Sequence, residues 1–183
     1  ILGATPLDFS INNSIKSTVD LLKENDFEVI STWAMGSTLE DIKDAGNADV
    51  NLVISYSGMG AAKYMYEKFN IPYIVGTPFG KEFAKKIVAD LKEAIITKEN
   101  KISYINRKID KNPQITIVGE SIMSESLAYA ISTEKNKTVN VISTLETDKN
   151  LLLEGDKLKI YEDDIEKELK NSKIIIDDPL YRT

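Results

Sequence analysis

The amino-acid sequence predicts an α/β protein built on parallel β-sheets. Short apolar runs alternate with amphipathic helical patterns along the chain. Some of these runs are continuous, which is typical of strands that are buried on both faces. The same order of elements also occurs twice. A parallel sheet with covering helices is the architecture that normally produces such alternation.

Residues 1–96 are predicted to form four strands that alternate with four helices. Apolar residues at helical spacing indicate the helices, and Gly or Pro near the ends of the apolar runs indicates turns. The strands are expected at residues 1–5, 27–33, 50–55 and 72–75, and the helices at 10–23, after a cap at Ser37 or Thr38, at 60–69 and at 81–96.

Residues 97–112 are charged and rich in Asn, and we expect them to link two domains as a helix or a loop. Ile102, Ile105 and Ile109 have helical spacing, so neither alternative is excluded. The strand–helix pattern then restarts after Pro113. Strands are expected at residues 114–119, 138–145, 158–161 and 173–177, and helices at 121–135 and 163–171.

The two parts of the chain resemble each other in the order of their elements. Residues 14–33 and 121–145 both open with Ser-Ile and both contain the letters VIST, and each follows a short strand with a glycine near its end. We therefore predict two Rossmann-like domains, at residues 1–96 and 113–183, with helices on both faces of each sheet. Because no helix follows the last predicted strand, either this strand lies at the edge of its sheet or the second domain is truncated. We favour truncation, with the chain as part of a longer protein.

The composition excludes several kinds of chemistry from this chain. It has 183 residues, no Cys, no His and a formal net charge of −6. It therefore supplies no Cys/His zinc site, no thiolate ligand, no disulfide and no His general base. The acidic balance argues against nucleic acid as a partner. No apolar run approaches the roughly 18 residues of a membrane span, and no signal peptide opens the chain, which predicts a cytoplasmic protein.

A first candidate for ligand binding is the glycine turn SYSGMG, which follows a predicted strand and opens a helix. It contains Ser55, Ser57 and Gly58. The turn resembles a dinucleotide fingerprint, but Lys63 replaces the third glycine or alanine. The glycines also suit a tight turn without any ligand.

A second candidate is GTPFGKE, which contains Thr77 and Gly80 and again lies between a strand and a helix. A helix N-terminus at this position offers free backbone N–H groups to an anion. The loop is not a P-loop, because only three residues separate its glycines and Glu82 stands where a hydroxyl is required. A simple turn into a helix is the alternative.

The third candidate turn contains Gly119 and Ser121, and Ser121 is most simply read as a helix cap. Ligands of open α/β sheets lie beyond the carboxyl ends of the strands, so we expect these three turns to line one cleft. No pair of carboxylates suggests acid–base catalysis, and no metal ligands are predicted. The residues predicted to bind a cofactor are Ser55, Ser57, Gly58, Thr77, Gly80, Gly119 and Ser121.

The ordered series of segments resembles the nitrogenase component 1 type oxidoreductase family. The resemblance rests mainly on NADVNLVIS and IPYIVGTPFG, supported by FEVISTWAMGSTLEDI, by PQITIVGESIMSESLAYAI and by EDDIEKELKNSKIIIDDPLYR. It implies subunits of three Rossmann-like domains that pair with a second component 1 type subunit. It also implies iron–sulfur clusters held by cysteines, a larger metallocluster or tetrapyrrole in some members, and electrons delivered by an ATP-hydrolysing iron–sulfur reductase.

No ligand residue of that family can be assigned in this chain, because it lacks Cys and His. One hypothesis is therefore that the chain is an internal fragment of a nitrogenase-like subunit, the scaffold around a cofactor site, and that it is inactive and binds no iron in isolation. The alternative is a two-lobed ligand-binding module without catalysis, similar to metal-chelate or vitamin-binding proteins.

Overall fold

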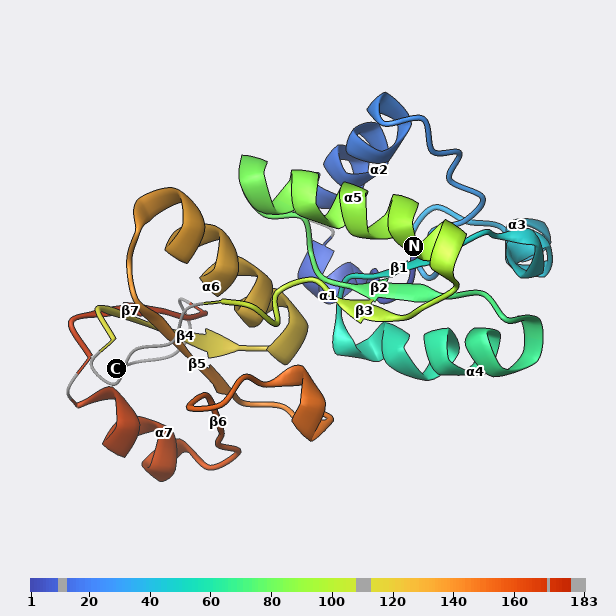
Figure 1. The fold of residues 1–183 in the computed structure, drawn as a ribbon. Helices are drawn as coiled ribbons and strands as arrows, with labels where there is room; N and C mark the ends of the chain where they lie inside the picture. The colour runs from blue at the N-terminus through green and yellow to red at the C-terminus, as the bar shows by residue number, and fades with distance from the viewer. Residues whose placement is uncertain (10–12, 108–112, 171, 179–183) are drawn as a thin grey trace. The chain divides into compact units, whose positions relative to one another are not determined.

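The computed structural model describes residues 1–9, 13–107, 113–170 and 172–178 (Figure 1). The chain divides into two compact units. The first contains Ile1–Pro78 and Lys85–Ser103, and the second contains Phe79–Ala84 and Tyr104–Thr183. Each unit has a parallel sheet with flanking helices, which confirms the predicted α/β fold with Rossmann-like parallel sheets.

The first unit is built on a three-stranded parallel sheet of order β1-β2-β3. Figure 1 shows α4 on one face of this sheet and α5 on the other. Val53, Ile54, Ile74 and Val75 are fully buried in it, as their continuous apolar runs predict. The elements are α1 (Pro6–Phe9), α2 (Ser14–Glu24), α3 (Leu39–Asp44), η1 (Ala45–Asn47), β1 (Asn51–Val53), η2 (Tyr56–Gly58), α4 (Met59–Phe69), β2 (Tyr73–Val75), α5 (Lys81–Thr97) and β3 (Lys101–Ile102).

The first unit differs from the sequence prediction in its first 33 residues, where it also contains the unpredicted helix α1. Residues 1–5 contribute a single parallel bridge, from Leu2 to Val53, and residues 27–33 do not form a strand. The second segment bonds to the backbone of Ile1 through Ser31 and Trp33, and its further bonds, from Phe27 N–H to Leu22 and from Thr32 N–H to Ser37 Oγ, are local. A ladder one residue long is too short to define a strand. Residues 10–12, at the start of a predicted helix, lie outside the described residues.

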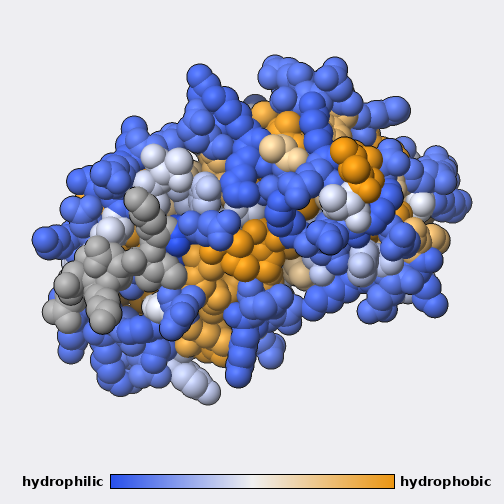
Figure 2. All heavy atoms as spheres, viewed as in Figure 1, coloured by the Kyte–Doolittle hydropathy of each residue, from blue (hydrophilic) through white to orange (hydrophobic). Residues whose placement is uncertain are grey.

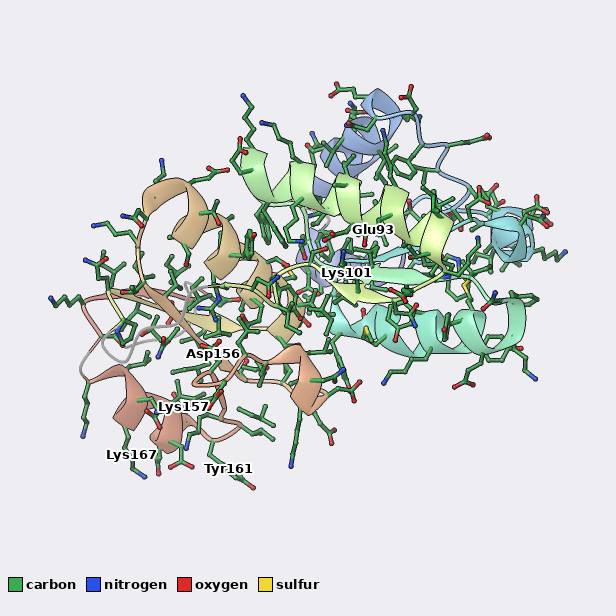
Figure 3. The ribbon with its side chains drawn as sticks, in the orientation of Figure 1. Glu93, Lys101, Asp156, Lys157, Tyr161 and Lys167 are labelled. Carbon is green, nitrogen blue, oxygen red and sulfur yellow. The ribbon has the colours of Figure 1, made fainter. Side chains whose placement is uncertain are left out.

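The predicted linking segment contributes strand β3. Side-chain contacts hold this strand against α5: Lys101 Nζ lies 2.8 Å from Glu93 Oε2 and 3.2 Å from Asp90 Oδ1 (Figure 3). Ser103 Oγ donates to Asp90 Oδ2 at 2.7 Å. Residues 108–112 of the predicted linker lie outside the described residues, and the predicted domain boundaries remain predictions.

The second unit is built on a four-stranded parallel sheet of order β6-β5-β4-β7. Its two faces carry separate apolar clusters, one with Ala128 of α6 and the other with Ile165 and Leu169 of α7. The clusters are separate because successive side chains of a strand point to opposite faces of the sheet. The elements are β4 (Ile115–Gly119), α6 (Ser121–Lys135), β5 (Val139–Ser143), η3 (Lys149–Leu151), β6 (Lys157–Leu158), α7 (Glu162–Leu169) and β7 (Ile174–Ile176).

Hydrophilic side chains cover much of the surface in the view of Figure 2, as expected for a chain in which 28% of residues are charged. Among the helices of the described residues, none combines the length and the apolar character needed to cross a membrane.

Candidate functional site at the carboxyl ends of the strands

Ser55 joins the end of β1 to the first residues of the chain in the first unit. It follows β1 and is buried, and its Oγ donates to the carbonyl oxygen of Gly3 at 2.5 Å. The same Oγ lies 2.8 Å from Ser57 Oγ. Gly3 has a φ of +88°, and a Cβ at this position would lie 2.7 Å from Ser55 Oγ. The hydroxyl of Ser55 is thus engaged in holding the turn, whereas Ser57 is exposed.

Gly58 allows the start of α4 to pack directly against backbone. A Cβ at this residue would lie 2.7 Å from both the Gly3 nitrogen and the Leu2 carbonyl carbon. Gly60, two residues later, is exposed, and a Cβ there would have no neighbouring atom within 4 Å. In the described structure no side chain caps the N-terminus of α4. α4 continues directly from the 3₁₀ turn η2, in which Gly58 N–H donates to the Ser55 carbonyl oxygen and Met59 N–H to the Tyr56 carbonyl oxygen, so these two amides are already engaged.

Thr77 lies at the end of β2, the strand next to β1. It is buried, and its Oγ1 donates to the carbonyl oxygen of Ile54 at 2.6 Å. Ser55, Ser57, Gly58 and Thr77 are therefore placed at the carboxyl ends of adjacent parallel strands. Their role in binding a ligand remains a prediction.

A carboxylate of the protein itself occupies the N-terminus of α5, the anion site expected at GTPFGKE. Glu134 Oε1 accepts from the backbone N–H of Lys81 at 2.5 Å and of Glu82 at 3.1 Å. These bonds from Glu82 and Lys81 lower the pKa of the Glu134 carboxyl. Gly80 leaves room for it, because a Cβ there would lie 2.5 Å from Glu134 Oε1. Gly80 thus makes space for a capping side chain that the protein itself supplies.

The third predicted turn also carries an internal cap, but the capping residue is Glu120 and not Ser121. Glu120 accepts from Ile122 N–H at 3.0 Å and from Met123 N–H at 2.9 Å. The interpretation of Ser121 as the cap is therefore wrong. A carboxylate has two acceptor oxygens and satisfies two free N–H groups at once, and its charge suits the helix N-terminus.

Ser121 and Gly119 are both engaged in packing beside this cap. Ser121 is buried, and its Oγ lies 2.8 Å from Thr147 Oγ1. A Cβ at Gly119 would lie 2.9 Å from Ser124 Oγ. Of the three predicted helix openings, only that of α4 lacks a capping side chain in the part of the chain that the structure describes.

The sequence did not reveal a buried charge cluster in the second unit, formed by Arg107, Glu125 and Asp156 (Asp156 is labelled in Figure 3). Arg107 Nη2 lies 2.9 Å from Glu125 Oε2 and also contacts Asp156, and Arg107 Nη1 donates to the Val139 carbonyl oxygen. All three side chains are fully enclosed. A signal for the cluster was present, since Glu125 is the one charged residue in the sequence between residues 121 and 131.

The carboxylates of this cluster also satisfy backbone N–H groups, which indicates a structural role. Asp156 Oδ1 accepts from Val141 N–H at 2.6 Å, and Glu125 Oε1 accepts from Leu153 N–H at 3.2 Å. Burial, together with the nearby charge of Asp156, raises the pKa of Glu125 to about 8. Perturbed carboxyls often mark reactive sites. Here, however, each is enclosed and bonded on both oxygens.

The parallel sheets, with polar turns at the carboxyl ends of their strands, give the chain the architecture of open α/β proteins, a class in which ligands bind beyond the carboxyl ends of the strands. The family model of nitrogenase component 1 type oxidoreductases matches residues 1–111, and the chain belongs to this family. The matched residues end before β4, so the likeness of the second unit to the family remains a prediction.

Curated relatives match about half of the chain. A subunit of the light-independent protochlorophyllide reductase of Prosthecochloris aestuarii is 33% identical over 94 residues, which are 50% of this chain and 17% of that protein. The nitrogenase molybdenum-iron protein alpha chain of Azospirillum brasilense is 35% identical over 98 residues, 51% of this chain and 20% of that protein. The matched part thus spans about a fifth of these relatives. No solved structure gives a significant match.

The residues of this chain do not fit an iron–sulfur cluster of the kind that the family resemblance implies. The chain has no Cys and no His. Among the residues that the structure describes, no group of three or more acidic side chains is arranged to hold a metal ion. Thiolates are the usual ligands of such clusters. Any cluster of the complete protein would need ligands from outside these residues.

Proposed function

We propose that this chain is part of a nitrogenase-like oxidoreductase subunit, in which it forms scaffold around a metallocluster or small-molecule site. The observation that carries the proposal is the family match over residues 1–111. Because the chain lacks Cys and His, thiolate or imidazole ligation in the complete protein would come from residues outside this chain.

Within this scaffold we propose that the turn after β1 contacts the ligand. Ser57 is exposed there, and the first amides of α4 have no capping side chain in the described structure. The N-terminus of a helix carries partial positive charge, so this end of α4 would stabilise negative charge that develops on a ligand during reduction. The exposed Ser57 hydroxyl, which donates to Ser55 Oγ in this structure, would turn to donate to the ligand. Ser55, Gly58, Thr77, Gly80, Gly119 and Ser121 would then act by shaping their turns.

Family membership also supports proposals about partners and location. We propose that the complete protein pairs with a second component 1 type subunit and receives electrons from an ATP-hydrolysing iron–sulfur reductase. Both would act in the cytoplasm, without nucleic acid or a membrane. The relatives described above are named as parts of a reductase and of a nitrogenase, and reduction requires electrons from a donor.

The test uses the longest polypeptide that the gene encodes, purified without oxygen together with the candidate reductase. We expect it to contain iron and to oxidise the reductase only when ATP is present. The chain of residues 1–183 should do neither. A complete polypeptide that takes up no electrons in the presence of ATP and reductase would contradict the proposal.

Two matched serine variants of the complete polypeptide test the role of the turn. Ser57 and Ser17 are both exposed. We expect Ser57→Ala to lower the rate of ATP-dependent electron uptake while the melting temperature stays unchanged. Ser17→Ala, on α2, should change neither quantity. Equal rates for the two variants would remove Ser57 from the site.

A further inference from the structure

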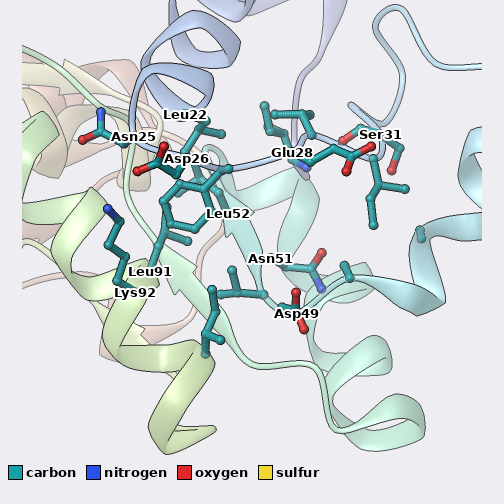
Figure 4. Close-up of a pocket in the computed structure, with 18 of the residues that line it drawn as sticks. Leu22, Asn25, Asp26, Glu28, Ser31, Asp49, Asn51, Leu52, Leu91 and Lys92 are labelled. Carbon is teal, nitrogen blue, oxygen red and sulfur yellow. The ribbon is translucent and has the colours of Figure 1, made fainter.

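Two pockets of the structure differ in the charge of their linings. The pocket of the first unit, of about 410 Å³, lies beside residues 28–31 and the beginning of β1. Figure 4 shows its charged lining, in which carboxylates outnumber the lysine: Asp26, Glu28, Asp49 and Lys92. The pocket of the second unit, of about 520 Å³, has the opposite balance. The two pockets therefore suit ligands of different charge.

The pocket of the second unit lies at the amino ends of the strands, on the face of the sheet that α7 covers. Val118 and Ile142 belong to the apolar cluster with Leu169 of α7. Two residues earlier in each strand, Thr116 and Asn140 are paired in register, and both line the pocket. Because alternate side chains of a strand share a face, these two polar residues lie on the same face as the apolar cluster. The pocket thus begins where the apolar packing under α7 ends.

The side-chain amide of Asn140 has no hydrogen-bond partner among the described residues. Its Oδ1 is enclosed, whereas its Nδ2 is not. Its neighbour Thr116 is bonded, since Thr116 Oγ1 lies 2.7 Å from Ser172 Oγ. An enclosed amide oxygen without a partner costs stability, because it has lost its hydrogen bonds to water. The amide of Asn140 therefore does not serve the fold, and its Nδ2 can donate to a ligand in the pocket.

Lysine side chains lie at this pocket in excess over carboxylates. Lys157 and Lys173 line it, and both are exposed (Lys157 is labelled in Figure 3). Among the described residues that line the pocket, Glu168 is the only acidic one. Glu168 forms an ion pair with Lys157, and its Oε1 lies 3.7 Å from Lys159 Nζ. Three ammonium groups thus accompany one carboxylate, in a chain whose net charge is −6.

Hydrogen bonds on both sides of Lys173 hold its backbone beside the pocket. Ser172 N–H donates to the carbonyl oxygen of Leu169 at 2.9 Å, and Ser172 Oγ bonds to Thr116 of β4. The next residue, Ile174, begins β7 and is paired with Ile115 of β4. The Lys173 ammonium group is therefore carried by backbone that is fixed to the sheet.

We propose that this pocket binds a small hydroxylated anion, of the class of sugar phosphates and hydroxy acids. Lys157 and Lys173 would contact its phosphate or carboxylate group, and Asn140 Nδ2 would donate to the same group. A volume of about 520 Å³ is that of a site for an organic ligand and exceeds the need of a lone anion. Because the rest of the lining is largely polar, it suits hydroxyl groups. The inference rests on the second unit and is independent of the proposed electron transfer.

Binding is tested by calorimetric titration of the complete polypeptide with glycerol 3-phosphate, ribose 5-phosphate and citrate. Glycerol and ribose are the neutral counterparts, and inorganic phosphate is the anion without carbon-bound hydroxyls. We expect at least one of the three organic anions to bind with a Kd below about 1 mM. The neutral compounds and inorganic phosphate should bind about tenfold more weakly or not at all, and added salt should weaken binding. A preference for the esters or for citrate distinguishes phosphate from carboxylate recognition.

Substitutions at the pocket connect this binding to the proposed site. Asn140→Leu removes the amide at similar side-chain volume. We expect the affinity to fall about tenfold or more while the melting temperature rises by roughly 2–6 °C, because the enclosed oxygen is gone. Lys173→Met should lower the affinity about tenfold at unchanged melting temperature, and Lys173→Arg should restore it. Lys167→Met is the control, since Lys167 is exposed on α7 and paired with Asp164, and it should leave the affinity unchanged.

Three results would overturn the proposal. The first is that none of the three organic anions shows saturable binding. The second is equal affinity for the anions and their neutral counterparts. The third is unchanged affinity in both Asn140→Leu and Lys173→Met, which would place the binding elsewhere in the polypeptide. If Asn140→Leu also lowered the melting temperature, the amide would have a structural role instead.

Discussion

Gly58 determines how closely α4 approaches the start of the chain, because the atoms opposite it are backbone atoms. A methyl group would lie 2.7 Å from the Gly3 nitrogen and from the Leu2 carbonyl carbon. Flexible side chains can move away from such a contact, whereas backbone within a sheet cannot do so without loss of its hydrogen bonds. The sequence suggests positive φ or ligand contact for this residue, and the structure assigns it to close packing.

We expect Gly58→Ala to lower the free energy of unfolding by about 1–3 kcal/mol through overpacking. Gly60→Ala is the matched control: this glycine lies two residues later, in the first turn of α4, and faces open space. The substitution should gain about 0.5–1 kcal/mol from the better helix propensity of Ala. Urea unfolding followed by the fluorescence of Trp33, the single Trp, measures both. Equal effects of the two substitutions would show that the contact at Gly58 can relax.

In a polypeptide that starts at Ile1, the amino group of this residue should make the first unit more stable at pH 8 than at pH 6. Its pKa falls from 8.0 to about 6 on folding, so the unfolded chain binds more protons between these values and stability rises with pH. The full difference is about 2–3 kcal/mol. Acetylation of Ile1 should abolish the dependence, and unchanged pH dependence after acetylation would exclude the amine as its source.

At the scale of single elements, helix ends and buried charges depend on partners distant in sequence. Glu134 caps α5 although 53 residues separate it from Lys81. In the second unit, 18 residues separate Arg107 from Glu125 and 49 separate it from Asp156. Such contacts depend on the exact positions of loops and helices. The spacing of apolar residues predicts those positions only approximately.

Replacement of Arg107 by Met should lower the free energy of unfolding of the second unit by about 3–5 kcal/mol, because it leaves enclosed carboxyls without their cation. Lys157→Met is the control, since its ion pair with Glu168 is partly exposed and should contribute at most about 1 kcal/mol. Hydrogen exchange in β4 and β5 reports on the unit. A loss below about 1 kcal/mol for Arg107→Met would mean that the cluster is dispensable.

Element types were predictable where local pattern decides them. The helix expected at 81–96 is observed at Lys81–Thr97, and the strand expected at 173–177 is observed at Ile174–Ile176. The strand predicted at residues 27–33 is wrong because a strand needs a neighbour along its whole length, and local sequence does not show which segment that neighbour is. The cap at Glu120 was missed because Ser is the commoner choice at that position.

At the scale of the whole molecule, the division between the two units falls within α5. Phe79–Ala84 belongs to the second unit, and the rest of the helix belongs to the first. Phe83 is fully buried, and its ring centroid lies 4.6 Å from that of Tyr129 on α6. No local sequence signal marks this division, because the helical pattern runs through it without a break.

We expect Phe83→Ala to destabilise the second unit by about 3–5 kcal/mol, and Ile87→Ala, four residues later in the same helix, to destabilise the first unit by about 2–5 kcal/mol. Residue-resolved hydrogen exchange distinguishes them: the first substitution should speed exchange in α6, and the second should speed exchange in β1 and β2. The same pattern of exchange for both variants would contradict the division within α5.

The strand order of the second sheet has a consequence for synthesis on the ribosome. β4 pairs with β7, the last strand of the described chain, through Ile115 and Ile174. At about 5–20 residues per second, the ribosome needs roughly 3–10 s to add the intervening chain. During that interval the apolar strand Ile115–Gly119 exposes an unpaired edge to other nascent chains. A polypeptide released before β7 would keep this edge open and would be prone to aggregate.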